Sequence, residues 1–179
     1  MLPLGTKAPE FELWDSVSNS IKTLNKLKGT QGTLILFICN HCPFVIHINE
    51  ALVSIANNLL SKGIGVIAIS SNDVEKYPQD GPEQMQLHAK NTNYPFPYLY
   101  DETQSVAKAY DAACTPDFFL FDSSLNLQYR GQLDDSRPGN GLPVDGADLL
   151  HAVKCMVENK VNNKPQKPSI GCNIKWKTS

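Results

Sequence analysis

The sequence predicts an α/β fold, and three observations support this class. Residues 33–38 form a short, almost wholly apolar run, which is typical of a strand covered on both faces. Residues 43–62 then place apolar side chains at spacings of three and four, the period of an amphipathic helix that ends at Gly63. A second apolar run follows at 65–69, and a strand–helix–strand succession implies a right-handed parallel crossover.

The other expected elements follow from shorter patterns of the same kinds. Alternation of apolar and polar side chains predicts half-buried strands, and helical spacing predicts further helices. The serine pair at 123–124 is a tight connection, so the segments on its two sides form a hairpin. In chain order, these elements are a strand around 11–13, a helix at 83–90, a short strand at 98–100, a helix at 103–110, hairpin strands at 118–121 and 125–129, and a helix at 147–157.

Length and composition fit a single folded domain. The chain has 179 residues, of which 41% are hydrophobic and 19% charged, so it can bury a sizeable core and is not a disordered chain. A formal net charge of −2 gives no reason to expect a nucleic-acid partner. No apolar run approaches the ~20 residues of a membrane helix, and the first residues lack a secretory pattern. We therefore expect a cytoplasmic protein without a membrane partner.

The C-terminal residues 159–179 differ from the rest, because they carry five lysines and no acidic residue. Apolar side chains stand at every second position from Ile170 to Trp176, which predicts a half-buried strand. We expect one domain at 1–158 and a C-terminal extension docked on it. On this pattern Cys172 lies on the apolar face and is a packing residue.

The strongest chemical signal is Cys39-Asn40-His41-Cys42-Pro43, where the first apolar strand becomes the helix. A thiolate is the reactive form of cysteine, and a helix N-terminus stabilises it. Cys39 precedes the first turn, so we expect it to be the more exposed thiol and the nucleophile. Cys42 then attacks the mixed disulfide and releases the product. His41 can stabilise the thiolate, Asn40 and His41 tune the reduction potential, and Pro43 suits the first helical turn.

Two other interpretations of the motif are open. The two cysteines could be ordinary buried residues, or they could bind zinc with His41. A tetrahedral zinc site needs four ligands, and only the isolated Cys114 and Cys172 could complete it. We therefore expect no bound metal, and the residues imply no organic cofactor.

A second candidate region is Cys114-Thr115-Pro116, directly before the apolar strand at 118–121. A Thr–Pro bond in such a place can be cis. If this loop faces the cysteine pair, Cys114 is either a third redox thiol or a small residue that packs the loop.

Asn72 and Asp73 are further candidates because they follow the second buried strand. Parallel strands end at a common edge of the sheet, so this strand should end beside Cys39. Asn72 and Asp73 either line the site there or form a turn.

These motifs resemble the thioredoxin-like superfamily. The cysteine pair after the first core strand and Thr-Pro-Asp-Phe-Phe-Leu-Phe-Asp at 115–122 carry this resemblance, and more closely they are similar to the redoxin branch of alkyl hydroperoxide reductases and thiol-specific antioxidant proteins. Within that branch, the chain looks like a peroxiredoxin-like subfamily. The segments that carry this closer likeness are Cys-Asn-His-Cys-Pro at 39–43, Tyr-Pro-Phe-Pro-Tyr-Leu-Tyr-Asp at 94–101, Leu-Asp-Asp-Ser-Arg-Pro-Gly-Asn at 133–140 and Pro-Ser-Ile-Gly-Cys-Asn-Ile-Lys-Trp-Lys at 168–177.

The resemblance implies a thioredoxin-like fold, with a central mixed sheet flanked by helices, an N-terminal extension and a C-terminal tail strand. It also implies a cis Pro116 that faces the cysteine pair, with the Thr115 backbone free to pair with substrate. Members of known activity are thiol–disulfide oxidoreductases or thiol peroxidases.

One departure separates these two activities. Peroxiredoxins carry Pro-x-x-x-Thr-x-x-Cys together with a distant arginine. Counted back from Cys42, the threonine place holds Cys39 and the proline place holds Ile35, and counting back from Cys39 fails as well. Arg130 and Arg137 are the only arginines, and neither lies near the strand at 118–121 in the sequence.

We therefore expect a thiol–disulfide oxidoreductase that acts on a protein or small-molecule disulfide and is recharged by a separate thiol electron donor. The alternatives are a thiol peroxidase acting on peroxide, and a non-catalytic redox sensor or zinc-binding module.

Overall fold

The computed structural model describes residues 2–178 of the chain. Its strands are β1 (Glu12–Asp15), β2 (Ser20–Thr23), β3 (Gly32–Phe37), β4 (Ile64–Ser70), β5 (Tyr98–Tyr100), β6 (Cys114–Thr115), β7 (Asp117–Asp122), β8 (Leu127–Gly131) and β9 (Cys172–Asn173). Its helices are α1 (Leu24–Leu27), α2 (Pro43–Ser61), the 3₁₀ turn η1 (Pro78–Asp80), α3 (Pro82–Thr92), α4 (Ser105–Ala109) and α5 (Ala147–Val157).

The strands of the described residues form a seven-stranded sheet in the order β2-β1-β5-β4-β3-β7-β8 and a small sheet of β6 and β9. At the centre, β3 and β4 are parallel, as the crossover through α2 predicts, and β5 is parallel to β4. Strand β7 is antiparallel to β3, and β8 is antiparallel to β7, as expected of the hairpin. The expected mixed sheet is therefore confirmed.

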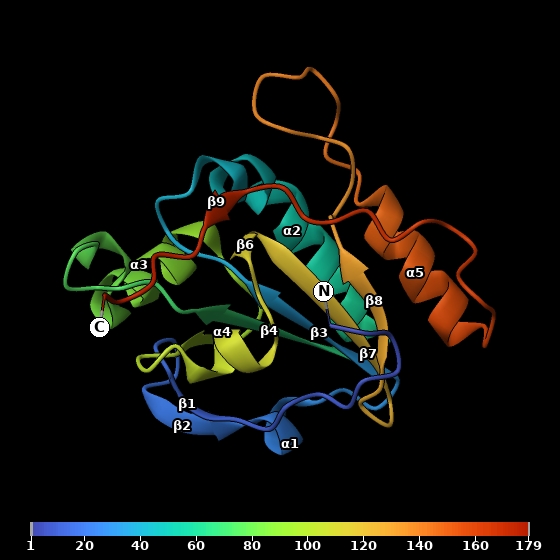
Figure 1. Ribbon diagram of the computed structural model, residues 1–179, viewed down its shortest axis with the longest axis horizontal. Coiled ribbons are helices and arrows are strands. Elements are labelled where there is room, and N and C mark those ends of the chain that lie inside the picture. The colour runs from blue at the N-terminus through green and yellow to red at the C-terminus, as the bar shows by residue number, and fades with distance from the viewer. Residues whose placement is uncertain (1, 179) are drawn as a thin grey trace.

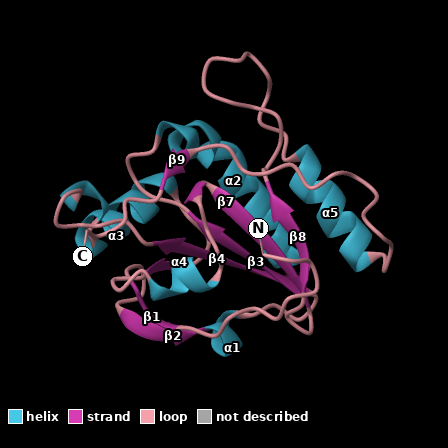
Figure 2. Ribbon diagram, viewed as in Figure 1, coloured by secondary structure: helices cyan, strands magenta, loops and turns pink. Residues whose placement is uncertain are grey.

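Helices cover both faces of the sheet (Figures 1 and 2). On one face, alternate residues of β3 such as Leu34 and Leu36 pack with apolar residues of α2, α3 and α5. On the other face, Ile35 and Phe37 pack with residues of α1 and α4. Every residue of β3 is buried, which is why this strand is a continuous apolar run in the sequence.

Local sequence sets the ends of α2. Pro43 occupies the first helical position, where a missing N–H is tolerated. After the helix, Gly63 has a φ of +76°, a backbone conformation that favours glycine. The start of α2 is therefore fixed directly after Cys42, and this position matters for the site below.

The C-terminal segment crosses the edge of the sheet where β3 and β4 end. It leaves α5, passes beside β6 and ends near α3, as the red part of Figure 1 shows. Only Cys172 and Asn173 pair as a strand, so the expected strand from Ile170 to Trp176 is much shorter than its alternation suggests. Among the described residues, no helix has the length and apolar character needed to cross a membrane.

Candidate active site

The two cysteines of the motif lie at the end of β3 and the start of α2, opposite the loop that carries Pro116. The Thr115–Pro116 peptide bond is cis, as expected. Cys39 Sγ lies 3.5 Å from the Thr115 hydroxyl, and the Cys42 thiol donates a hydrogen bond to the Thr115 carbonyl at 3.2 Å. The structure therefore brings together four of the residues that the sequence singles out.

Exposure does not separate the two thiols, because both are buried, and the greater reactivity expected of Cys39 stays a prediction. Cys39 is 1% exposed and Cys42 is 0% exposed. The segment of η1 on one side explains part of this burial, because the Asn40 side chain donates to the Gln79 carbonyl at 2.8 Å. On the other side, Cys172 of the C-terminal segment lies against Cys42.

The pKa values of the two thiols are shifted in the opposite sense to the one expected from the motif. Cys42 is the residue that precedes α2, so its sulfur, and not that of Cys39, takes the position at the helix start. The hydrogen bond with Cys39 is the largest cause that lowers the pKa of Cys42 to about 4. Burial opposes it, and hydrogen bonding with Cys172, Thr115 and the Val45 backbone lowers this pKa further. The same hydrogen bond to Cys42, burial and the nearby charge of Asp80 raise the pKa of Cys39. Cys42 is therefore the more acidic thiol of the pair.

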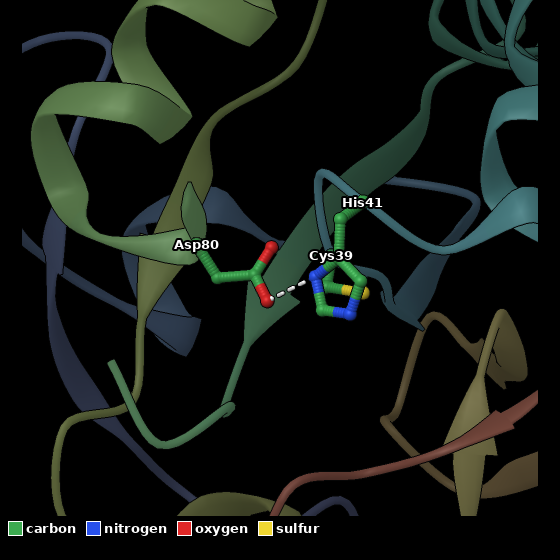
Figure 3. Close-up of side chains that lie close together, drawn as sticks. All are labelled: Cys39, His41 and Asp80. Carbon is green, nitrogen blue, oxygen red and sulfur yellow. Dashed lines mark ion pairs between the residues drawn. The ribbon is translucent and has the colours of Figure 1, made fainter. Parts of the chain in front are cut away.

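Asp80 is a member of the site that the sequence analysis did not single out. Its carboxylate is fully buried and accepts the backbone N–H of Asn40 at 2.8 Å. It also lies 2.7 Å from His41 Nδ1, and the two form an ion pair when the imidazole is protonated (Figure 3). The His41 ring stacks on Tyr77 with its plane 3° from parallel. Asp80 thus fixes the two residues between the cysteines.

Cys39, His41 and Asp80 are also the residues that could hold a metal ion in this region, because their donor atoms lie within 4.8 Å of one another. The 2.7 Å between His41 Nδ1 and Asp80 Oδ2 is a hydrogen-bond distance. Two ligands of one tetrahedral zinc ion, each about 2 Å from the metal, would stand farther apart. The arrangement therefore suits a hydrogen-bonded network better than a zinc site.

Asn72 and Asp73 hold the site together from the end of β4. The Asn72 amide donates to Asp80 at 2.8 Å, and its oxygen accepts the Lys175 N–H at 2.8 Å. The Asp73 N–H in turn donates to the Lys175 carbonyl at 2.8 Å. Of the two interpretations in the sequence analysis, the structure favours the one that places them at the site, where they anchor the C-terminal segment.

Cys114 is buried beside the dithiol, and its thiol lies 3.6 Å from the Pro116 carbonyl. Burial, with the nearby Asp117 carboxylate, raises its pKa to about 12. Cys114 is therefore held neutral, which favours its interpretation as a packing residue of the loop.

Cys172 packs against the hydrophobic core, as expected of a packing residue, but it also lies at the dithiol. Its sulfur lies 3.0 Å from that of Cys42, and the residue is only partly buried. The reason is that β9 pairs with β6, which puts Cys172 opposite Thr115. Alternation within the tail gives no information about this long-range pairing.

Both arginines of the chain are engaged away from the dithiol. Arg130 contacts Asp111 at 3.1 Å and Asp117 at 3.4 Å, with its guanidinium over the Phe119 ring. Arg137 donates to the carbonyls of Asp134 and Ser136.

This geometry agrees with the comparison to known proteins. A model of the AhpC/TSA family matches residues 4–130. The chain belongs to the AhpC/TSA family. Its fold is thioredoxin-like, as the sequence motifs imply. No curated protein matches the chain at a significant level.

Several solved structures share this fold. An uncharacterized conserved protein from Geobacillus kaustophilus is 54% identical over 100% of this chain and 95% of its own, with a TM-score of 0.97. A hypothetical protein from Sinorhizobium meliloti is 48% identical over 100% of this chain and 97% of its own, with a TM-score of 0.95. The thioredoxin domain of a thiol-disulfide oxidoreductase from Bacteroides vulgatus shares the fold at 18% identity, covering 90% of this chain and 100% of its own, with a TM-score of 0.62.

Proposed function

We propose that this member of the AhpC/TSA family is a thiol–disulfide oxidoreductase that works through Cys39 and Cys42. The observation that carries the proposal is a hydrogen-bonded dithiol at the start of α2, in which one thiol has its pKa lowered to about 4. A thiolate at neutral pH beside a second thiol is what disulfide exchange requires. The neighbour from Bacteroides vulgatus, named as a thiol-disulfide oxidoreductase, shares the fold on which this chemistry is built.

In the proposed reaction, the Cys42 thiolate attacks one sulfur of the substrate disulfide. The substrate's other sulfur leaves as a thiolate and takes up a proton, and a mixed disulfide remains on Cys42. Cys39 then loses its proton and attacks the Cys42 sulfur, which releases the second substrate thiol and forms the Cys39–Cys42 disulfide. A separate thiol donor reduces this disulfide again.

Thr115 and Pro116 position the substrate in this proposal. Strand β6 lies at the dithiol and pairs with β9, so an extended polypeptide that displaces β9 can pair with β6 as a short strand. The substrate class is therefore a disulfide in an extended segment of a protein or peptide. An odd number of cysteines, all of them free, supports a reducing compartment such as the cytoplasm.

A paired assay tests this function. Reduction of insulin disulfides with dithiothreitol as donor should turn over catalytically in the native chain, be lost in Cys42→Ser and be lowered in Cys39→Ser. Cys155→Ser is the matched control, because Cys155 lies on α5 away from the dithiol.

Consumption of hydrogen peroxide is measured on the same samples. Peroxide turnover without insulin turnover would replace the proposal with a thiol peroxidase. Loss of neither activity in the two site variants would contradict any role for the dithiol.

A further inference from the structure

The C-terminal segment occupies the place that a substrate strand would take. Strand β9 pairs antiparallel with β6, with Cys172 directly across from Thr115. Thr115 is the residue before Pro116 and also the residue that contacts both sulfurs of the dithiol. The tail therefore presents its own cysteine to the dithiol as a docked strand of the same chain.

Two glycines show that this close approach is built into the sequence. A Cβ on Gly171 would lie 2.0 Å from the Thr115 carbonyl oxygen, so any larger residue would push the tail away from β6. A Cβ on Gly131 would lie 2.3 Å from the Lys167 carbonyl oxygen, where the tail first meets the sheet. Glycine is required at each of these contacts because backbone meets backbone there.

Anchors on both sides of Cys172 fix its position along the tail. Before it, the Ser169 hydroxyl donates to the Gly131 carbonyl at 2.7 Å. After it, Gln104 donates to the Lys175 carbonyl at 2.9 Å and accepts the Lys177 N–H at 2.9 Å. The segment is thus held at β8 and again at the edge where β4 ends.

The sulfurs of Cys42 and Cys172 are 3.0 Å apart, closer than a van der Waals contact, and a disulfide bond of about 2.05 Å needs a further movement of about 1 Å. We propose that Cys172 is a third redox-active thiol, which serves as an alternative to Cys39 and resolves the mixed disulfide on Cys42 by forming a Cys42–Cys172 disulfide within the chain. This assignment rests on the proposed function for the formation of the mixed disulfide.

The step is balanced in atoms and electrons. A substrate strand displaces the tail from β6, and the Cys42 thiolate forms the mixed disulfide with it. The tail then returns, and Cys172 loses its proton and attacks the Cys42 sulfur. The bond between Cys42 and the substrate breaks, and the substrate thiolate leaves and takes up the proton. Two thiols of the chain are oxidised and the substrate disulfide is reduced to two thiols.

The electrostatics of Cys172 agree with this order of events. Burial, the hydrogen bond to Cys42 and the Cys42 charge raise the pKa of Cys172 to about 11, while Lys175 opposes the rise. Once Cys42 is part of a mixed disulfide, its charge is gone and only burial still raises this pKa. Cys172 therefore becomes a better nucleophile at the stage when it has to attack.

Disulfide mapping of the full chain tests the assignment. The reduced protein is treated with oxidised glutathione, alkylated and digested with trypsin. Peptide 29–62 contains Cys39 and Cys42, and peptide 161–175 contains Cys172, because trypsin does not cleave Lys164 and Lys167 before proline. We expect these two peptides to be cross-linked in the native chain and in Cys39→Ser, where Cys42 is the only cysteine of its peptide.

Two variants test whether the cross-link depends on Cys172 and on the docked tail. In the double variant Cys39→Ser, Cys172→Ser, glutathione should stay on Cys42. In Gly171→Ala all the thiols remain, but the displaced tail lowers the local concentration of Cys172 at Cys42, so the cross-link should fall about tenfold. Cys155→Ser should behave as the native chain, and circular dichroism verifies that each variant folds.

The outcomes separate this assignment from the proposed function. A Cys39→Ser chain that keeps glutathione on Cys42 without a cross-link would overturn the role of Cys172, even with normal insulin turnover. A cross-link of equal yield in Gly171→Ala would overturn it too, because docking would then be irrelevant. A cross-link in a chain without insulin turnover supports the role of Cys172 and contradicts only the proposed function.

Discussion

The position of Cys42 directly before α2 is one of the features that make it the more acidic thiol of the pair. The motif alone suggests Cys39, because it comes first and precedes the helical segment. The structure places the helix start one residue after Cys42, so the Val45 N–H and the helix dipole act on the second sulfur. The hydrogen bond with Cys39 is the larger cause of the lowered Cys42 pKa, and the Val45 N–H adds to it.

The first prediction concerns the acidity of Cys42. With its pKa lowered to about 4, Cys42 should be ionised from weakly acidic pH upward and protonate only as the pH falls through about 4. The ultraviolet absorbance of the thiolate, followed against pH, measures this. The signal should vanish in Cys42→Ser and persist in Cys155→Ser. A single transition near pH 9 in the native chain would show that neither sulfur is stabilised as a thiolate.

The second prediction concerns the buried Asp80 carboxylate. Its charge contributes to the raised pKa of Cys39, so Asp80→Asn should make Cys39 more acidic. In a Cys42→Ser background, Cys39 is the remaining cysteine of peptide 29–62, and its iodoacetamide labelling can be followed alone. We expect labelling several-fold faster at neutral pH after Asp80→Asn, and unchanged labelling after Glu158→Gln on the exposed surface. A slower rate would mean that anchoring of His41, and not charge, is what Asp80 contributes.

At the scale of elements, the sequence predicts a strand or helix well when one or both of its faces pack against the core. The run at 33–38 is β3 within a residue, and 147–157 is α5 without a shift. The tail is predicted less well, because its partner is β6, a strand of two residues from another part of the chain. Periodicity reports the burial of a face, and it carries no information about which distant segment supplies the contact.

The third prediction uses this difference within the tail. Ile170 and Ile174 share the expected apolar face, but Ile174 is 3% exposed and Ile170 is 58% exposed. Ile174→Ala should lower the free energy of unfolding by about 2–5 kcal/mol, the usual cost of a buried isoleucine. Ile170→Ala, the matched control, should stay within about 0.5 kcal/mol of the native chain. Urea unfolding measures both, and equal losses would mean that the tail docks along its whole apolar face.

For the whole molecule, the family, the fold and much of the site follow from the sequence. Cys39, Cys42, Thr115 and Pro116 are found by their local motifs and do meet in space. Asp80 is missed, because a lone aspartate in a polar loop carries no pattern. It becomes recognisable only when η1 folds back on the end of β3.

Buried tyrosines set the response of the whole domain to alkaline pH. Tyr98 and Tyr110 are fully enclosed in the core, on opposite faces of the sheet. Burial is the largest cause that raises the pKa of each phenol above its ordinary value of 10.0. Above about pH 10 the unfolded chain therefore loses phenolic protons that the folded chain keeps.

The last prediction follows from this difference in bound protons. Where the folded state binds more protons than the unfolded state, the free energy of unfolding falls as pH rises. Stability should thus fall above about pH 10, by up to roughly 1.4 kcal/mol per pH unit for each tyrosine that stays protonated. Urea midpoints measured across this range, with a reductant present, give the slope.

Tyr110→Phe should make the slope shallower, although it also removes the hydrogen bond to the Pro9 carbonyl and so lowers stability at neutral pH. Tyr77→Phe, on the half-buried loop before η1, should leave the slope unchanged. An equal slope in all three chains would show that the buried phenols ionise without unfolding the core.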